Sequence, residues 1–214
     1  MKNKLKVALI GGTGKSGKYL TRQLLHQGFP VKMLLRDAAK LTIKNPLIEV
    51  VNGNARDYST ILSLVEGCNG ILSTLGGHTK GEPPIFSHAT THVLQAMKAC
   101  GINRYVLTTG LNVDTPSDKK GVKTALATQW MKENYPLTTA DKQTEQTILL
   151  DSEIDWTLVR LPLIELTDEK GEIKISLEDC PGDKISATDL ADFLIGQLED
   201  LTYVRSAPFI ANCC

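Results

Sequence analysis

Apolar residues in this chain gather in short runs that alternate with longer segments of helical periodicity. The runs lie at 5–10, 31–35, 48–51, 70–74, 104–109 and 156–159. Several of them are apolar throughout, which is typical of strands covered on both faces. Strands that alternate with helices predict a parallel sheet. We therefore expect an α/β protein with helices on both sides of the sheet.

The segments between the runs repeat apolar residues at the spacing of amphipathic helices. A helix is predicted over 15–27, with Gly17, Leu20 and Leu24 on one stripe and Gly28 as its C-terminal cap. Further helices are predicted over 85–100, over 139–150 and from Ser186 or Thr188 onward.

Length and composition narrow the class of protein. With 214 residues and 42% hydrophobic content, the chain suits one domain with one substantial core. The 24 basic and 24 acidic residues balance, so nothing indicates a nucleic acid or an anionic membrane as partner. The first apolar run is too short for a secretion signal or a membrane span. A small-molecule ligand fits this neutral surface better.

Cysteine usage indicates a reduced, cytoplasmic protein without a metal site. The cysteines form no C-x-x-C pair and no zinc-like group with the four histidines. Cys213 and Cys214 at the end of the sequence leave two interpretations open, a redox role or an uninvolved tail.

The stretch IGGTGKSGKYL at 10–20 has two interpretations. A triphosphate loop, G-x-x-x-x-G-K-[ST], needs four residues between its glycines, and here Leu9 stands where the first glycine belongs. The glycines at 11, 14 and 17 instead match a dinucleotide-binding turn between a strand and a helix. In such a turn Gly11 permits the sharp exit, Gly14 lets the backbone approach a pyrophosphate, and Gly17 allows close packing of helix on strand. Glycines that serve only a tight connection are the remaining alternative.

The end of the second predicted strand bears on the choice of dinucleotide. An acid there is typical of NAD sites, whereas a cation suits the 2′-phosphate of NADP. Arg36 comes first, and Lys15 could reach the same phosphate, which favours NADP(H) over NAD(H). Alternatively, Arg36 and Asp37 are a solvated pair.

Several short motifs in order carry a family resemblance. GGTGKSG, LLRD, VVNGNARD, ILSTLGG, RYVLTTG, K-x-x-E-x-x-L ahead of WTLVRLP, and ISATDLADFL occur in this sequence. Their succession resembles atypical short-chain dehydrogenases, most closely the NmrA-like and NAD(P)H-flavin reductase or biliverdin reductase B group. The resemblance spans almost the whole chain. It implies a single-domain, Rossmann-like doubly wound sheet with the cofactor along the carboxyl edge of the strands.

The resemblance also assigns residues to the cofactor. The glycine turn would hold the pyrophosphate and Arg36 the adenosine phosphate. Asn54, which replaces the family's usual Asp, and Ala55 would lie beside the adenine. The segment after the fourth strand would pass the nicotinamide ribose, and the one after the sixth strand the carboxamide. The complete set is Gly11, Thr13, Gly14, Lys15, Ser16, Gly17, Arg36, Asn54, Ala55, Ser73, Thr74, Leu75, Gly76, Thr108, Leu161 and Pro162.

The residues for chemistry match the family less well. Carbonyl-reducing relatives use Tyr-x-x-x-Lys, in which the tyrosine protonates the product. Lys142 matches the lysine, but Thr138 stands in the tyrosine position, and Pro136 separates Tyr135 from the helix. Thr109 replaces the family's serine and could hydrogen-bond an acceptor. The catalytic candidates are thus Thr109 and Lys142, unless Thr109 merely ends a strand and Lys142 forms a solvated pair with Glu145.

Without the tyrosine, the resemblance favours a particular reaction. Flavins and quinones delocalise the charge left by hydride addition, so they need a strong acid less than a ketone does. We expect NADPH-dependent reduction of a flavin, quinone or similar conjugated acceptor, with any flavin a substrate and not a bound group. The alternative is a non-catalytic, NmrA-like redox sensor. A sugar-nucleotide epimerase is disfavoured because about fifty residues follow the sixth strand.

Segments near 75–84, 111–137 and 161–182 are expected to shape the acceptor region. The first is rich in glycine and proline and predicts a flexible rim, in which His78 faces either substrate or solvent. The second contains Trp130, which could cover the acceptor as part of a helical lid or pack into the core. We expect a monomer or a homodimer.

Overall fold

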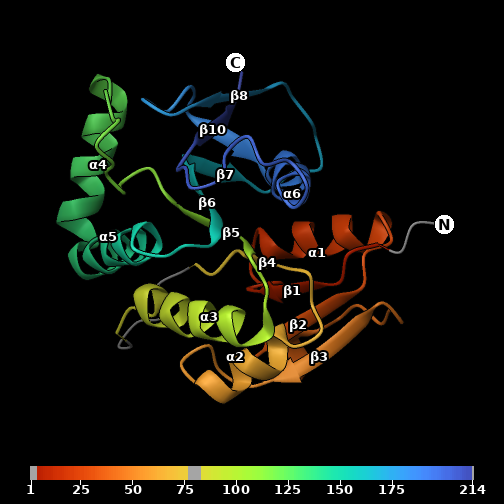
Figure 1. Ribbon diagram of the computed structural model, residues 1–214. Coiled ribbons are helices and arrows are strands. Elements are labelled where there is room, and N and C mark those ends of the chain that lie inside the picture. The colour runs from red at the N-terminus through yellow and green to blue at the C-terminus, as the bar shows by residue number, and fades with distance from the viewer. Residues whose placement is uncertain (1–3, 77–82, 214) are drawn as a thin grey trace.

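The computed structural model describes residues 4–76 and 83–213, and its centre is an eight-stranded sheet in the order β3-β2-β1-β4-β5-β6-β10-β8 (Figure 1). The paired strands from β3 to β10 run parallel, whereas β8 is antiparallel to β10. The predicted doubly wound parallel sheet is therefore confirmed, with one antiparallel strand added at its edge. The strands are β1 (Val7–Ile10), β2 (Val31–Leu35), β3 (Ile48–Asn52), β4 (Gly70–Ser73), β5 (Arg104–Gly110), β6 (Asp155–Leu161), β8 (Ile173–Ser176) and β10 (Phe209–Asn212), while β7 (Leu163–Glu165) and β9 (Lys184–Ser186) form a separate parallel pair.

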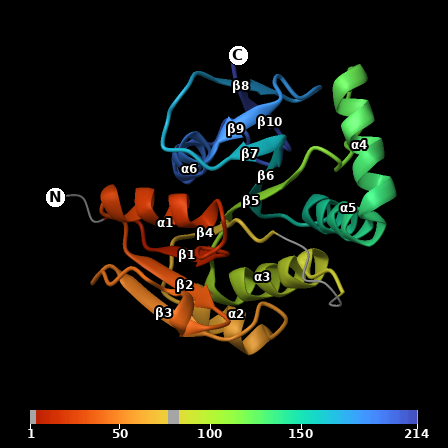
Figure 2. The ribbon, with the colours of Figure 1, turned by 180° about the vertical axis from the view of Figure 1, so that it is seen from behind.

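Helices cover both faces of the sheet, as the continuously apolar strands predict. Two apolar clusters separate the layers, one under α1 and α6 and the other under α2, α3 and α5. Figures 1 and 2 show these groups on opposite sides of the sheet, with α4 at the edge of the molecule. The helices are α1 (Gly17–His26), α2 (Tyr58–Val65), α3 (Phe86–Cys100), α4 (Val122–Asn134), α5 (Pro136–Leu150) and α6 (Ala187–Gly196), with a short 3₁₀ turn η1 (Ala38–Lys40) after β2.

Local signals explain where the helices begin and end. Gly101 closes α3 in the left-handed conformation, with φ of 67°, and Ser186 caps α6 by accepting a hydrogen bond from the Asp189 backbone N–H. Helix α5 begins three residues earlier than expected because Pro136 occupies its first turn, where its missing N–H costs nothing. The short strands from β7 to β10 were not predicted.

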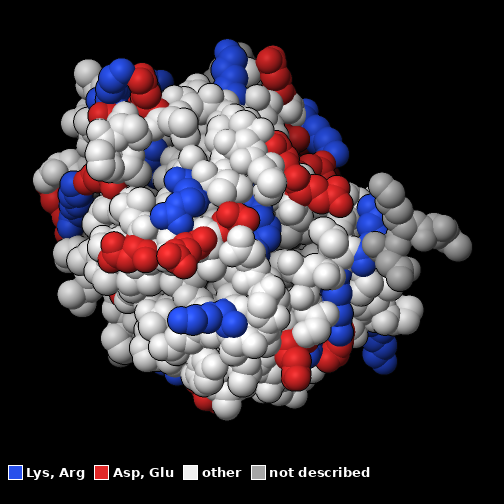
Figure 3. Space-filling model, in the orientation of Figure 1, with Lys and Arg blue, Asp and Glu red and all other residues white. Residues whose placement is uncertain are grey.

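The surface agrees with the balanced charge. Acidic and basic side chains lie interspersed on the face drawn in Figure 3. Every helix within residues 4–76 and 83–213 is too short or too polar to cross a lipid bilayer.

Candidate functional site

The turn between β1 and α1 is packed too tightly for side chains. Gly11 has φ of 82°, and a Cβ there would lie 2.7 Å from the Thr74 carbonyl oxygen. A Cβ on Gly17 would lie 2.0 Å from the Gly11 carbonyl oxygen, so the start of α1 touches the turn directly. The Gly14 N–H donates to the same oxygen at 2.9 Å. The backbone is thus exposed to any ligand that lies over the turn.

A cleft of about 290 Å³ opens over this turn, at the carboxyl ends of β1, β2 and β4. This edge is where open α/β sheets bind ligands, at the point where the strand order reverses. The residues predicted to bind the cofactor that line the cleft are Gly11, Thr13, Gly14, Arg36, Asn54, Ala55, Thr74, Leu75 and Gly76.

The other predicted residues do not line the cleft. Ser73 is buried and its hydroxyl accepts from the Leu75 backbone N–H at 3.3 Å, while Thr108 donates to the Ser73 carbonyl oxygen at 3.5 Å. Leu161 is 6% exposed at the end of β6. Also outside the lining are Lys15, Ser16, Gly17 and Pro162.

Sequence reasoning missed part of the lining. Arg56 directly follows Asn54 and Ala55 in the motif NGNARD, so its neighbours could have signalled it. Thr138 was noted as the residue in the tyrosine position, and the structure places it on the cleft wall. The missed residues are Ile10, Leu34, Asp37, Arg56, Ile85, Phe86 and Thr138, whereas Pro83 and Pro84, also in the lining, belong to the segment 75–84 that was expected to form a rim.

Two arginines and one acid line the cleft beyond β2 and β3. The Asp37 carboxylate caps η1 by accepting from the Ala39 backbone N–H at 3.0 Å. The Arg56 guanidinium donates to the carbonyl oxygens of Pro83 and Pro84 and thereby ties the cleft rim to the segment after β3. With Arg36 also in the lining, the end of the cleft beside β2 has a net positive charge.

The opposite wall depends on the contact between α3 and α5. Helix α3 has no side-chain cap of its own. Asp141 of α5 supplies one, because its Oδ2 accepts from the backbone N–H groups of Phe86 at 2.8 Å and Ser87 at 3.4 Å. This contact places Phe86 in the cleft wall beside Thr138.

Lys142 lies one helical turn behind Thr138. Its Nζ is 4.9 Å from the centre of the Phe86 ring, and Phe86 lines the cleft. Burial lowers the pKa of the Lys142 ammonium, and the charge of Glu145 opposes this shift. The structure thus places Lys142 next to the cleft lining and not within it.

Glu145 is buried, so a solvated pair with Lys142 is the wrong interpretation. The residue is 4% exposed and its Oε1 accepts from the Thr90 hydroxyl at 2.7 Å, while its Oε2 has no hydrogen-bond partner among the described residues. Burial raises the pKa of Glu145 to about 7, although Thr90 and Lys142 lower it. Tyr105, whose hydroxyl lies 3.4 Å from that of Thr90, also has a raised pKa because of burial.

The remaining chemical candidates are placed as follows. Thr109 is 3% exposed at the end of β5, does not line the cleft, and has a hydroxyl without a hydrogen-bond partner among the described residues. Trp130 neither packs into the core nor lines the cleft, since it is 53% exposed on α4. Residues 77–82, which include His78, and Cys214 lie outside the described residues.

A family model described as NAD(P)H-binding matches residues 11–201. Among curated proteins, an NAD(P)H azoreductase from Xenophilus azovorans is 24% identical over 194 residues, which cover 86% of this chain and 60% of the azoreductase. The chain spans between about a third and three fifths of the length of the curated relatives it matches.

Two solved structures have the same fold at low sequence identity. The anaerobillin reductase ChuY from Escherichia coli O157:H7 superposes with a TM-score of 0.79 at 19% identity, covering 97% of both chains. A short-chain dehydrogenase/reductase from Veillonella parvula, solved in complex with NADP, gives a TM-score of 0.79 at 13% identity and covers 97% of this chain and 94% of that one.

Proposed function

The chain belongs to the NAD(P)H-binding family, and we propose that it is a reductase that uses NADPH to reduce a small conjugated acceptor such as a flavin or a quinone. The observation that carries this proposal is the cleft over the glycine-rich turn that contains Gly11 and Gly14. When bound, the cofactor supplies a hydride. The names of two relatives, an azoreductase and an anaerobillin reductase, support a reduction.

The residues of the cleft fit this cofactor. A Cβ on Gly11 would collide with Thr74, and one on Gly17 with Gly11. The bare backbone at these positions leaves room for a pyrophosphate against backbone N–H groups at the start of α1. The turn would hold the pyrophosphate, while Asn54 and Ala55 would lie beside the adenine.

The charges at the end of the cleft beside β2 support a preference for NADP(H). In NAD sites an acid after the second strand binds the ribose hydroxyls. Asp37 is committed in part to capping η1 and Arg56 in part to the carbonyl oxygens of Pro83 and Pro84, and with Arg36 the lining holds two cations against one acid. We assign the 2′-phosphate to Arg36.

The presence of Thr138 in the cleft wall, at the position of the family's tyrosine, is evidence for a conjugated acceptor. The phenol of tyrosine, with a pKa near 10, can donate a proton that an aliphatic hydroxyl does not release at neutral pH. Thr138 therefore orients an acceptor without acting as its acid. A conjugated acceptor delocalises the negative charge that hydride addition leaves, so it does not need a strong proton donor from the protein.

Calorimetric titrations of NADPH, NADH and magnesium ATP into the protein and its Arg36→Ala variant test the cofactor. We expect Arg36→Ala to weaken NADPH by at least about tenfold, since a charge-assisted hydrogen bond contributes about 1.5–3 kcal/mol, and to leave NADH unchanged. Arg22→Ala is the control, because Arg22 pairs with Asp168 on the surface. Equal losses for both nicotinamide cofactors, or binding of magnesium ATP alone, would refute the assignment.

Anaerobic assays of NADPH oxidation with flavin mononucleotide, riboflavin, small quinones and an azo dye test the reaction. We expect turnover with at least one of them. Tight cofactor binding without turnover would instead support the alternative, a redox sensor that binds NADP(H) and does not consume it.

A further inference from the structure

Helix α4 carries an apolar stripe that faces solvent. Val122, Leu126 and Trp130 recur every four residues and are 78%, 66% and 53% exposed. Tyr135 and Leu137 extend the stripe past the end of the helix at 39% and 70% exposure, and the rings of Trp130 and Tyr135 are 5.7 Å apart. We call these five residues the α4 stripe. A row of large apolar residues on the outside of a helix indicates an interface.

The stripe points away from the body of the protein. A helix turns by about 100° per residue, which places Thr124 and Thr128 on the side of α4 opposite to Leu126. Both threonines are 5% exposed, and Thr128 donates to the Leu111 carbonyl oxygen at 3.3 Å. Figures 1 and 2 both show α4 at the edge of the molecule. The stripe therefore belongs neither to the core nor to the cleft described above.

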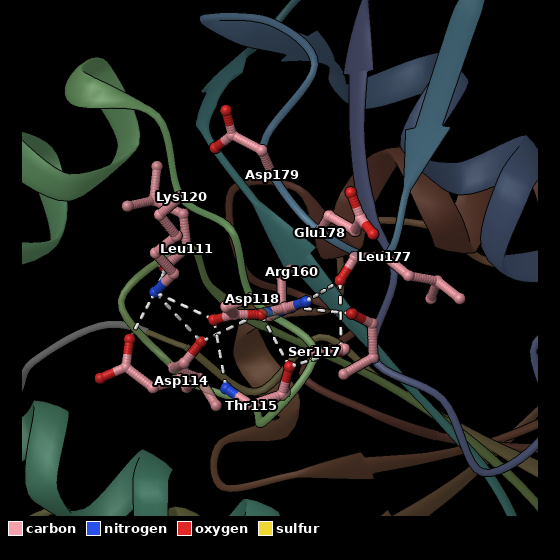
Figure 4. Close-up of polar contacts among 12 residues, drawn as sticks. Leu111, Asp114, Thr115, Ser117, Asp118, Lys120, Arg160, Leu177, Glu178 and Asp179 are labelled. Carbon is pink, nitrogen blue, oxygen red and sulfur yellow. Dashed lines mark hydrogen bonds and ion pairs between the residues drawn. The ribbon is translucent and has the colours of Figure 1, made fainter.

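A buried ion cluster holds the start of α4 in place. Lys120, just before the helix, donates to the Leu111 carbonyl oxygen at 2.9 Å and to Asp114 at 2.6 Å. Asp118 bonds Arg160 of β6 at 2.6 Å, as Figure 4 shows. Because the helix is anchored at its first turn, a partner that binds its outer face would cause only a small loss of conformational entropy in α4.

The exposed area fits a dimer interface. Large apolar and aromatic side chains carry roughly 150–250 Å² each, so the exposed parts of the stripe amount to on the order of 500 Å². A standard interface buries about 800 Å² on each partner, of which the apolar part of a homodimer is about two thirds. The stripe alone supplies that apolar part.

We propose that the α4 stripe is the interface of a two-fold symmetric dimer, in which α4 packs antiparallel against α4 of a second copy. Pairing about the helix midpoint sets Leu126 against the partner's Trp130 and Lys123 against the partner's Glu133. Lys123 and Glu133 are exposed and carry opposite charges, so the symmetric arrangement is electrostatically complementary. Lys123 also pairs with Asp183 of its own chain at 3.0 Å, but both side chains of that pair are exposed and Lys123 remains accessible to a second acid. A lipid surface fits less well, because a membrane-binding helix uses its basic residues to attract anionic lipids, whereas Lys123 and Lys132 of α4 already pair with Asp183 and Asp114.

Sedimentation velocity over a hundredfold range of protein concentration tests the dimer. We expect a concentration-dependent dimer whose dissociation constant rises at least tenfold in Leu126→Lys. Leu201→Lys is the matched control, because Leu201 is 60% exposed and lies outside α4. A monomer at every concentration, or equal effects of both variants, would overturn the proposal.

Charge reversal distinguishes the antiparallel arrangement from other uses of the stripe. Glu133→Lys is expected to weaken the dimer several-fold, and adding Lys123→Glu to restore it. Failure of this rescue would overturn the pairing. A protein that stays monomeric and floats with phosphatidylserine vesicles would show that the stripe is a membrane contact instead. None of these results depends on cofactor binding or turnover.

Discussion

Two clusters around buried charged side chains, one at Arg160 and one at Glu145, differ in how completely the charge is paired. The Arg160 cluster consists of Arg160, Asp118, Lys120 and Asp114 beside the start of α4 (Figure 4). The Glu145 cluster consists of Glu145, Lys142, Thr90 and Tyr105 between α3, α5 and β5.

The Arg160 cluster is saturated with partners. The guanidinium is fully buried and donates to Asp118, to the Ala207 carbonyl oxygen at 2.8 Å and to the Leu177 carbonyl oxygen at 3.2 Å. Its Cζ also lies 3.5 Å from the centre of the Phe209 ring. A charge held in this way is fixed in its ionised form, so the cluster joins the segment before α4 to β6 and β10.

The Glu145 cluster is only partly paired. Glu145 uses one carboxylate oxygen with Thr90, while its other oxygen has no partner among the described residues. A buried acid with incomplete partners changes protonation near neutral pH, and such groups concentrate at functional sites. Its place behind Lys142 and the cleft wall suits that interpretation. Buried charges whose hydrogen bonds are all satisfied therefore stabilise the fold, whereas a buried acid with an unsatisfied oxygen remains able to titrate.

The largest expected effect comes from breaking the saturated cluster. Asp118→Asn leaves the Arg160 guanidinium buried without its counter-charge, which should lower the free energy of unfolding by about 3–5 kcal/mol. Urea denaturation at neutral pH measures this loss. Asp183→Asn removes the partner of Lys123 in an exposed pair and should cost less than about 1 kcal/mol. Similar losses for the two variants would contradict the structural role of the Arg160 cluster.

A smaller change in the free energy of unfolding, of opposite sign, is expected for Glu145→Gln. Because folding raises the pKa of Glu145 from 4.5 to about 7, the folded state holds its proton more tightly than the unfolded state. The protein therefore loses stability as the pH rises from 4.5 through 7. Glutamine removes this loss, so the variant should be about 1–3 kcal/mol more stable than the unaltered protein at pH 8, with the gain shrinking toward pH 4.5.

Urea denaturation at several pH values measures this difference. The exposed Glu199→Gln variant serves as the control for the loss of a surface carboxylate. A Glu145→Gln variant whose difference from the unaltered protein is independent of pH would show that Glu145 does not titrate in this range.

The sequence predicted the regular half of the molecule well. Strands β1 to β6 follow from continuous apolar runs, and α1 and α3 from their apolar stripes and terminal glycines, because local patterning and turn chemistry specify these elements. The glycine turn and Arg36, both predicted to bind the cofactor, lie in the cleft lining. The turn could be predicted because a backbone that leaves no space for a Cβ requires glycine at those positions.

What the sequence did not predict depends on tertiary packing. Phe86 enters the cleft wall because Asp141, 55 residues away, caps α3. The spacing of Lys142 and Glu145 is that of a surface ion pair, and charged residues are seldom buried, so the pattern favours the wrong interpretation. The sequence did contain one signal that Glu145 is buried: Thr138, Lys142, Glu145 and Leu149 fall on one face of the helix.

The smallest expected effect is a change in the pKa of Glu145 when the charge of Lys142 is removed. The Lys142 ammonium lowers the pKa of Glu145 through its charge, so Lys142→Met should raise that pKa above about 7. Carboxyl ¹³C NMR titration of glutamate-labelled protein follows the shift, with the resonance assigned by its absence from Glu145→Gln. Lys98→Met, an exposed change near the end of α3, should leave the titration unmoved. If the Glu145 midpoint stayed constant or fell in Lys142→Met, the two groups would not be coupled, and Lys142 would have to be stabilised by Phe86 alone.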